Sequence, residues 1–348
     1  MKTHIPADQL YLRHKLSYPQ IDRMQGTQHA PMHQKDILDN FNNIREFIMV
    51  TDGFRKLSIP FIPMKGPLLS ARIYGDAAIR RMHDLDLLLN TKDVPLAYDN
   101  LVRLGYIPDL KLPDSETGRK ILWDHNKHLS FVHPQKKTCF ELHWQLVDFK
   151  DHFEYHFDTI YQNLTMTQHF MNRKFRVLKS EYDLLFLLIH GAAHKWQRLK
   201  WLVDINDFLH NIRFDEQLLR SLARSYKAER VLALYNKVAI LYLPNPQLID
   251  IKVNVPEFLV KSCIREIKRK EVVWIPRSFK EAVTFSYFFY RYLFLLFPDR
   301  QSRIENIKRS LVNAYDLKMV KTNNLFLLIL VRPFSYLYRH ISGIQRRK

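Results

Sequence analysis

Two acidic residues, Asp84 and Asp86, stand one residue apart at the start of an apolar run. In a β-strand alternate side chains share a face, so this spacing places both carboxylates on one side while Leu85 and Leu87 turn into the core. Two carboxylates this close repel each other unless a cation neutralises them, and an all-oxygen ligand set favours Mg²⁺ or Mn²⁺. A solvated pair of acids at a strand end is the alternative interpretation.

Basic residues and a glycine turn lie near this pair. Lys65-Gly66 falls between an expected strand and an expected helix, where helical N–H groups and a cation can hold phosphate. Arg80 and Arg81 precede Asp84, and a guanidinium group matches the geometry of phosphate oxygens. These residues are candidates for binding a nucleotide phosphate.

A third acid, Glu141, lies on another expected strand, with His143 on the same face. Three acids on sheet strands beside a glycine turn and basic residues are what phosphoryl or nucleotidyl transfer requires. Two acids hold metal on the triphosphate, and the third deprotonates or orients the attacking hydroxyl.

Several motifs follow one another in a characteristic order. They are Lys65-Gly66-Pro67-Leu68, Tyr74-Gly75-Asp76, the Arg80–Leu88 segment with its two acids, Glu141-Leu142-His143-Trp144, and the later pair of segments His190–Trp196 and Leu199–Asp204. As an ordered set, over roughly residues 37–210, they resemble the poorly characterised nucleotidyltransferase family of bacterial genomes, which belongs to the DNA polymerase β-like superfamily.

The resemblance implies a minimal nucleotidyltransferase fold that moves an NMP group from NTP, ATP among the candidates, to an unidentified hydroxyl or phosphate acceptor with release of pyrophosphate. It implies Mg²⁺ (or Mn²⁺) on Asp84, Asp86 and Glu141, and places Gly66 on the nucleotide-phosphate turn. The superfamily at large has Gly-Ser on that turn. Here Pro67 follows Gly66 and offers neither hydroxyl nor N–H, and Lys65 is the candidate to compensate.

His190 and His194 are spaced i, i+4 on an expected helix, a spacing seen in pairs of metal ligands, but the motif lacks the Glu of a zinc protease. Two interpretations stay open: histidines that pack between domains, or a helix face that closes the nucleotide cleft. In the second, the cations would come from Lys195, Arg198 and Lys200, with Asp204 pairing with one of them and His143 nearby.

The elements around these residues predict an α+β fold: a nucleotidyltransferase core with a small mixed β-sheet, followed by a mostly helical C-terminal domain. Helical periodicity or capping signals indicate helices over 37–56, 68–74, 93–104, 180–193, 199–209 and 231–243. Strand patterns cover 59–64 and 80–89, and a hairpin is expected between 129–133 and 138–147. Prolines 60 and 63 restrict the first strand to a sheet edge.

The predicted organisation is an N-terminal extension (1–35), a nucleotidyltransferase-like core (36–150), a helical domain (151–245) and a basic, aromatic-rich helical C-terminal region (246–348). The 348 residues carry a formal net charge of +19, which indicates anionic partners, and 47% hydrophobic residues exclude a disordered chain. Two cysteines are too few for a disulfide framework, so no disulfide partner is expected.

The sequence shows no secretory signal and no spanning stretch, so we expect a cytoplasmic protein, with peripheral contact to the inner face of the membrane left open. From 300 to 348 Lys and Arg far outnumber Glu305 and Asp316. Three interpretations of that region stay open: a solvated helical face, a contact with an anionic membrane, or a binding site for single-stranded nucleic acid.

Two functional alternatives to the nucleotidyltransferase stay open. One is a catalytically weak nucleotide- or nucleic-acid-binding regulatory protein, and the other is a peripheral membrane component of an envelope-polysaccharide pathway.

Overall fold

The computed structural model describes residues 5–147, 152–270, 279–311, 326–331 and 334. The chain divides into two compact units, one made of residues 1–109 and 128–272, the other of residues 110–127 and 273–348. The first unit contains the larger sheet and every residue that the sequence predicts to carry chemistry.

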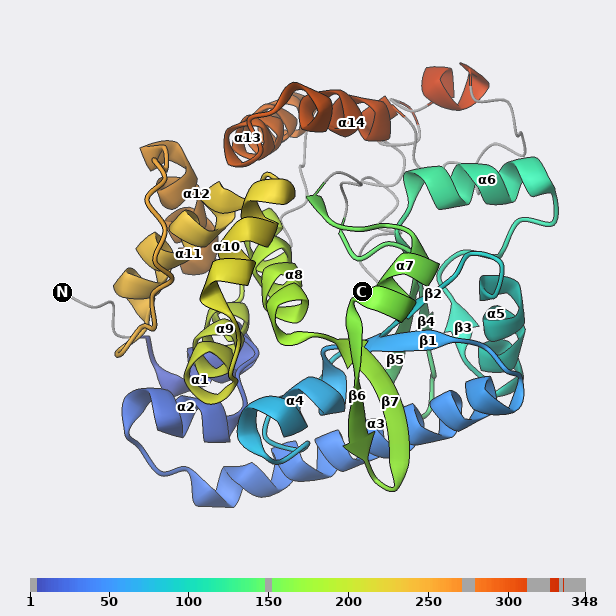
Figure 1. The fold of residues 1–348 in the computed structure, drawn as a ribbon, viewed down its shortest axis with the longest axis horizontal. Helices are drawn as coiled ribbons and strands as arrows, with labels where there is room; N and C mark the ends of the chain where they lie inside the picture. The colour runs from blue at the N-terminus through green and yellow to red at the C-terminus, as the bar shows by residue number, and fades with distance from the viewer. Residues whose placement is uncertain (1–4, 148–151, 271–278, 312–325, 332–333, 335–348) are drawn as a thin grey trace. The chain divides into compact units, whose positions relative to one another are not determined.

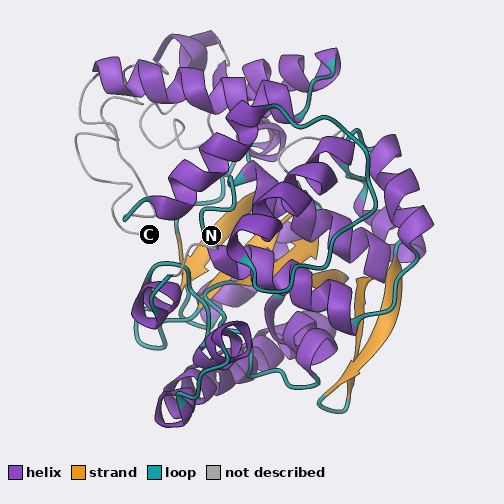
Figure 2. Ribbon diagram, turned by 90° about the vertical axis from the view of Figure 1, so that its left-hand side faces the viewer, coloured by secondary structure: helices purple, strands orange, loops and turns teal. Residues whose placement is uncertain are grey.

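A five-stranded sheet runs through the first unit, and Figure 2 draws its strands in orange. The strand order is β1-β2-β5-β4-β3. Its strands are β1 (Phe61–Met64), β2 (Leu85–Leu89), β3 (Ile107–Pro108), β4 (His128–Val132) and β5 (Cys139–His143). β2 and β5 are parallel, whereas the other neighbours are antiparallel, so the predicted mixed sheet is confirmed. β1 lies at the edge, as its prolines predict, because Pro63 has no N–H to donate to a second neighbour.

The strand that carries the acids is shorter than the sequence pattern predicts, because β2 begins at Leu85 rather than at Arg80. The backbone N–H of Arg80 donates to Ser70 Oγ (3.1 Å), and that of Met82 donates to Asn40 Oδ1 (3.2 Å). Since side chains already satisfy these donors, residues 80–84 form a loop, and Asp84 directly precedes the strand instead of belonging to it.

Three helices accompany these strands: α3 (Ala30–Lys56), α4 (Gly66–Tyr74) and α5 (Val94–Arg103). The long helix α3 runs along the lower edge of the view in Figure 1 and contacts α2 and α5. It begins before the predicted start at residue 37 and ends at Lys56, as predicted. Pro67 lies in the first turn of α4, where its missing N–H leaves no helical hydrogen bond broken.

The first 35 residues contain two short helices, α1 (Ala7–Leu12) and α2 (Tyr18–Gln25). Ser17 caps α2 in a reciprocal capping box with Gln20. The segment is packed into the first unit: its apolar side chains Leu10, Leu16 and Ile21 are fully buried. The Arg13 guanidinium donates to three backbone carbonyls, those of Gln197 (2.7 Å), Glu266 (2.8 Å) and Arg269 (2.8 Å).

The rest of the first unit is mainly helical. It comprises α7 (Phe157–Asn163), a hairpin of β6 (Thr165–Phe170) and β7 (Arg173–Leu178), α8 (Ser180–Ala193), α9 (Leu199–Asn211), α10 (Glu216–Ser225), α11 (Glu229–Tyr242) and α12 (Glu257–Lys268). The helices predicted over 180–193, 199–209 and 231–243 are confirmed as α8, α9 and α11. α8 contacts α9, α10 and α11, while α4 contacts α9 and β1 contacts β7 (Figure 1). The helical part and the sheet therefore share one compact unit.

The second unit contains α6 (Glu116–His125), α13 (Phe279–Leu296) and α14 (Arg300–Leu311). Within it, Ile121 and Leu328 are buried in one small apolar cluster. Most of the basic segment 300–348, on which the membrane and nucleic-acid interpretations depend, lies outside the described residues. Among the helices that the structure describes, none combines the length and apolarity needed to cross a bilayer.

Gly191 on α8 provides a test of this packing. A Cβ atom at this position would lie 2.0 Å from Cζ3 of Trp196, a fully buried and rigid ring. We expect Gly191→Ala to lower the free energy of unfolding by about 1–3 kcal/mol, measured by denaturant unfolding, because the ring or the helix must shift.

The matched control is Gly53→Ala, another helical glycine, where the added Cβ meets only the side chain of Asn100 at 3.0 Å. Alanine also favours the helix at that position. Equal losses of stability in the two variants would contradict the packing described for Trp196.

Candidate active site

The parallel pairing of β2 with β5 places Asp86 directly opposite Glu141. One carboxylate oxygen from each of Asp84, Asp86 and Glu141 lies within 4.8 Å of the others. The structure thus brings together the three acids that the sequence singles out, from two separate parts of the chain. A convergent set of carboxylate oxygens is suited to Mg²⁺ or Mn²⁺.

Charge is distributed unevenly over these acids. Burial raises the pKa of Asp84, and repulsion from Asp86 and Glu141 raises it further. Burial also acts to raise the pKa of Asp86, but Lys65 and His143 outweigh it, and the net pKa is lowered. Lys65 and His143 therefore favour the charged form of Asp86. The charged form of Asp84 is disfavoured by burial and by repulsion from the other two carboxylates, and a bound cation would relieve that repulsion.

The turn between β1 and α4 brings Lys65 to the acids. Its Nζ lies 3.4 Å from Asp86 Oδ2, and the side chain is largely buried. Lys65 and Gly66 both have φ of +56°, a region that costs energy for a side chain such as lysine. The chain adopts this strained turn where Met64, at the end of β1, pairs with Asp86. The strain shows that the surrounding structure constrains this turn.

Arg80 is buried in an ion pair with a helix of the same unit. Its Nε donates to Asp204 Oδ2 on α9 at 2.8 Å, and Gln20 Nε2 donates to the other carboxylate oxygen at 3.2 Å. The sequence predicts a partner for Asp204 among Lys195, Arg198 and Lys200, whereas the structure gives it Arg80. The pair fixes the loop that leads into Asp84 against α9.

Arg81 and Lys200 meet at the same loop. The Arg81 guanidinium lies over the Tyr11 ring, 4.1 Å from its centroid, and donates to the Tyr11 carbonyl (3.0 Å). Lys200 Nζ donates to the Arg81 carbonyl. Burial, reinforced by Arg80, lowers the pKa of Lys200 to about 7, although Asp204 and Asp84 act in the opposite direction.

The helix face with the two histidines lies close to the acids. His190 Nε2 is 3.3 Å from Lys65 Nζ, so α8 reaches the same lysine that pairs with Asp86. The rings of His190 and His194 both contact Trp201, with centroids 5.2 Å apart in each case. His190 thus packs against an aromatic ring of α9 and lies beside the lysine that pairs with Asp86.

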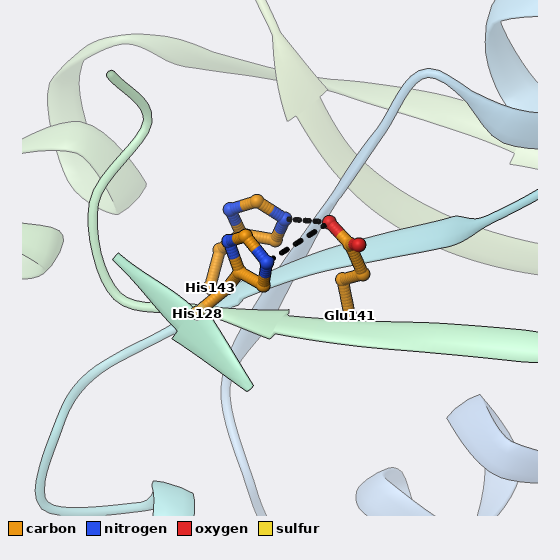
Figure 3. Close-up of side chains that lie close together, drawn as sticks. All are labelled: His128, Glu141 and His143. Atoms are coloured by element: carbon orange, nitrogen blue, oxygen red, sulfur yellow. Dashed lines mark hydrogen bonds and ion pairs between the residues drawn. The ribbon is translucent and has the colours of Figure 1, made fainter. Parts of the chain in front are cut away.

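Sequence reasoning missed His128, which faces Glu141 from β4 (Figure 3). Antiparallel pairing sets His128 opposite His143, and Ser130 opposite Glu141. This register follows from the hairpin turn, where the His133 N–H bonds to the carbonyl of Thr138 at 3.0 Å. Counting back from the turn along both strands would have found His128.

A model of the family described as uncharacterised nucleotidyltransferase matches residues 30–244, more than half of the chain. The chain belongs to this family. Searches of the curated proteins and of the solved structures give no match. The matched segment of this nucleotidyltransferase family member runs from α3 to the end of α11, so it includes all three acids, the Lys65 turn and the α8–α9 pair that supports them.

The buried pair of Arg80 and Asp204 gives a stability prediction. Their side chains are 4% and 2% exposed, so Asp204→Asn leaves a buried guanidinium without its counter-charge. We expect a loss of about 3–5 kcal/mol in the free energy of unfolding, measured in urea. Asp250→Asn, at a residue whose side chain is 78% exposed, should lose about 0–1 kcal/mol. Similar losses in both variants would contradict a structural role for the buried pair.

Lys200 gives a pH prediction. Its pKa falls from 10.5 to about 7 on folding, so between these values the unfolded chain binds more protons and this residue makes stability rise with pH. Lys200→Met removes that contribution, so the variant should lose stability relative to the wild type as pH rises through this window. Denaturant unfolding across it measures the difference, with Lys261→Met, at an exposed lysine, as control. A difference independent of pH would contradict the shift.

Proposed function

We propose that this chain is a metal-dependent nucleotidyltransferase that moves an NMP group from NTP to a hydroxyl or phosphate acceptor and releases pyrophosphate. The observation that carries the proposal is the convergence of Asp84, Asp86 and Glu141 across the parallel strands β2 and β5, in a member of a nucleotidyltransferase family. The placement in the DNA polymerase β-like superfamily is part of this proposal.

The residues fit a divalent ion. Asp86 Oδ1 is buried and, among the described residues, has no hydrogen-bond partner, and the pKa of Asp84 is raised by burial and by the other two acids. A cation among the carboxylate oxygens would satisfy that oxygen and offset the repulsion among the acids. When bound, Mg²⁺ or Mn²⁺ would neutralise charge on the triphosphate and on the departing pyrophosphate.

The chain's own residues supply the remaining functions. Asp84, Asp86 and Glu141 would hold the ion, and Glu141 would also orient the acceptor hydroxyl and take its proton as the new oxygen–phosphorus bond forms and the bond to pyrophosphate breaks. Lys65, at the N-terminus of α4 with Gly66, binds the triphosphate and takes the place of the hydroxyl that Pro67 lacks.

Arg80 and Arg81 support this site from the loop before Asp84. The structure pairs Arg80 with Asp204, so we propose that it positions Asp84, while Arg81 retains a share in phosphate binding from the rim. His143, His190, His194 and Lys200 complete the substrate cleft in this proposal. The acceptor stays open among small molecules, sugar phosphates and protein side chains.

One observation favours the alternative of a nucleotide-binding regulatory protein with weak catalysis: Pro67 removes a hydroxyl and an N–H from the phosphate turn. That alternative retains the fold and the nucleotide but not the dependence on metal. Metal dependence of nucleotide binding therefore separates the two functions.

The test is a calorimetric and thermal-shift titration of the full chain with each NTP, with and without Mg²⁺. We expect at least one NTP to bind only with Mg²⁺ and to stabilise the fold by about 2.7 kcal/mol at a hundred times its dissociation constant. Asp86→Asn should abolish this binding, and Asp250→Asn, on the exposed surface, should retain it.

The contrary result is equally clear. Nucleotide binding that is the same with and without Mg²⁺, and the same in wild type and Asp86→Asn, would replace the transferase proposal with the regulatory one. Absence of binding by every NTP would contradict both.

A further inference from the structure

A second set of donor atoms lies beside the three acids, on the β4–β5 hairpin. His143 Nε2 is 3.2 Å and His128 Nε2 is 3.6 Å from the same oxygen, Glu141 Oε2 (Figure 3). One donor atom from each of these residues lies within 4.8 Å of the others. Two imidazole nitrogens thus lie against one carboxylate oxygen.

The two nitrogen–oxygen separations are close to the edge length of a coordination tetrahedron. Zinc binds imidazole nitrogen and carboxylate oxygen at about 2.0–2.2 Å, which places neighbouring ligands of a tetrahedral ion about 3.3–3.6 Å apart. The two measured nitrogen–oxygen distances lie at or close to this range. An ion could enter among the three atoms with only small movements of the side chains.

The two imidazole rings belong to directly paired residues of β4 and β5. The His128 and His143 rings lie side by side, with centroids 4.7 Å apart and planes inclined by 33°. A transition-metal ion accepts two imidazoles as neutral ligands, so both rings could bind one ion from this position.

Two further contacts complete the set. Ser130 Oγ donates to Glu141 Oε1 at 3.3 Å, so a hydroxyl orients the carboxylate with Oε2 toward the histidines. Asp86 Oδ1, buried and without a hydrogen bond among the described residues, lies 3.6 Å from His143 Nε2. Asp86 thus adjoins the set at His143.

We propose that His128, His143 and Glu141 form a transition-metal site for an ion such as Zn²⁺, distinct from the Mg²⁺ or Mn²⁺ position on the carboxylates and sharing Glu141 with it. Nitrogen ligands select borderline ions such as Zn²⁺ or Co²⁺, and an all-oxygen set suits Mg²⁺. The site goes beyond the proposed transfer reaction, because its occupancy requires neither nucleotide nor acceptor.

The test uses the full chain, stripped of metal with a chelator and then titrated with Co²⁺ and Zn²⁺ in excess Mg²⁺, without nucleotide. We expect about one equivalent of Co²⁺ to bind with the visible absorption of a low-symmetry, four-coordinate ion, and Zn²⁺ to displace it. His128→Asn and His143→Asn should each weaken binding at least about tenfold, because each removes a ligand.

Two controls distinguish the sites. His169→Asn replaces an exposed histidine on β6, and Asp84→Asn removes a ligand of the carboxylate position alone; both should retain the Co²⁺ signal. Thermal unfolding of each metal-free variant verifies that it is folded. His128 lies on β4 and is partly exposed, so we expect His128→Asn to fold. If His143→Asn does not fold, His128→Asn alone still tests the proposal.

Three results would overturn the proposal: no stoichiometric Co²⁺ or Zn²⁺ binding, binding that survives both histidine substitutions, or loss of binding in Asp84→Asn with retention in His128→Asn. The last would assign the ion to the carboxylate position. Since no nucleotide is present, this outcome is independent of whether any NTP binds.

Discussion

The repulsion among carboxylates on two adjacent parallel strands is the constraint on which the site depends. The register of β2 and β5 fixes Asp86 opposite Glu141. Asp84 lies one residue before the start of β2, so its position is fixed by the same strand. Burial makes this negative charge costly, and the structure offsets it with Lys65 on one side and His143 on the other. A divalent ion on the same oxygens would take over that role.

The helical part of the first unit holds the residues around these acids in place. Arg72 on α4 pairs with Asp183 on α8 at 2.6 Å, and Arg80 pairs with Asp204 on α9 at 2.8 Å. Both pairs are buried, so each ties the position of one segment near the acids to that of a helix. α8 also brings His190 to Lys65. The helices thus act with the sheet as one structure around the three acids.

Local sequence signals predicted much of this arrangement. The acids were expected together on the strand, whereas only Asp86 belongs to β2 and Asp84 lies in the loop before it. Prolines restricted β1 to the sheet edge, where it lies. The start of β2 could not be predicted, because the N–H groups before it bond to side chains from distant segments. The hairpin of β6 and β7 was missed because Met171 and Asn172 both take left-handed φ at its turn, and methionine gives no such signal. His128 could have been found only by extending the pairing register of the β4–β5 hairpin back to that residue.

The central claim is that Asp84, Asp86 and Glu141 hold the ion that carries the nucleotide triphosphate. Its most direct test is a crystal structure of the chain with Mn²⁺ and a non-hydrolysable NTP analogue, with anomalous data that locate manganese. The account predicts a manganese peak bonded to these carboxylates and to triphosphate oxygens, with Lys65 turned from Asp86 to the phosphates. A nucleotide bound elsewhere, or bound here without manganese and with the contact of Lys65 to Asp86 intact, would contradict it.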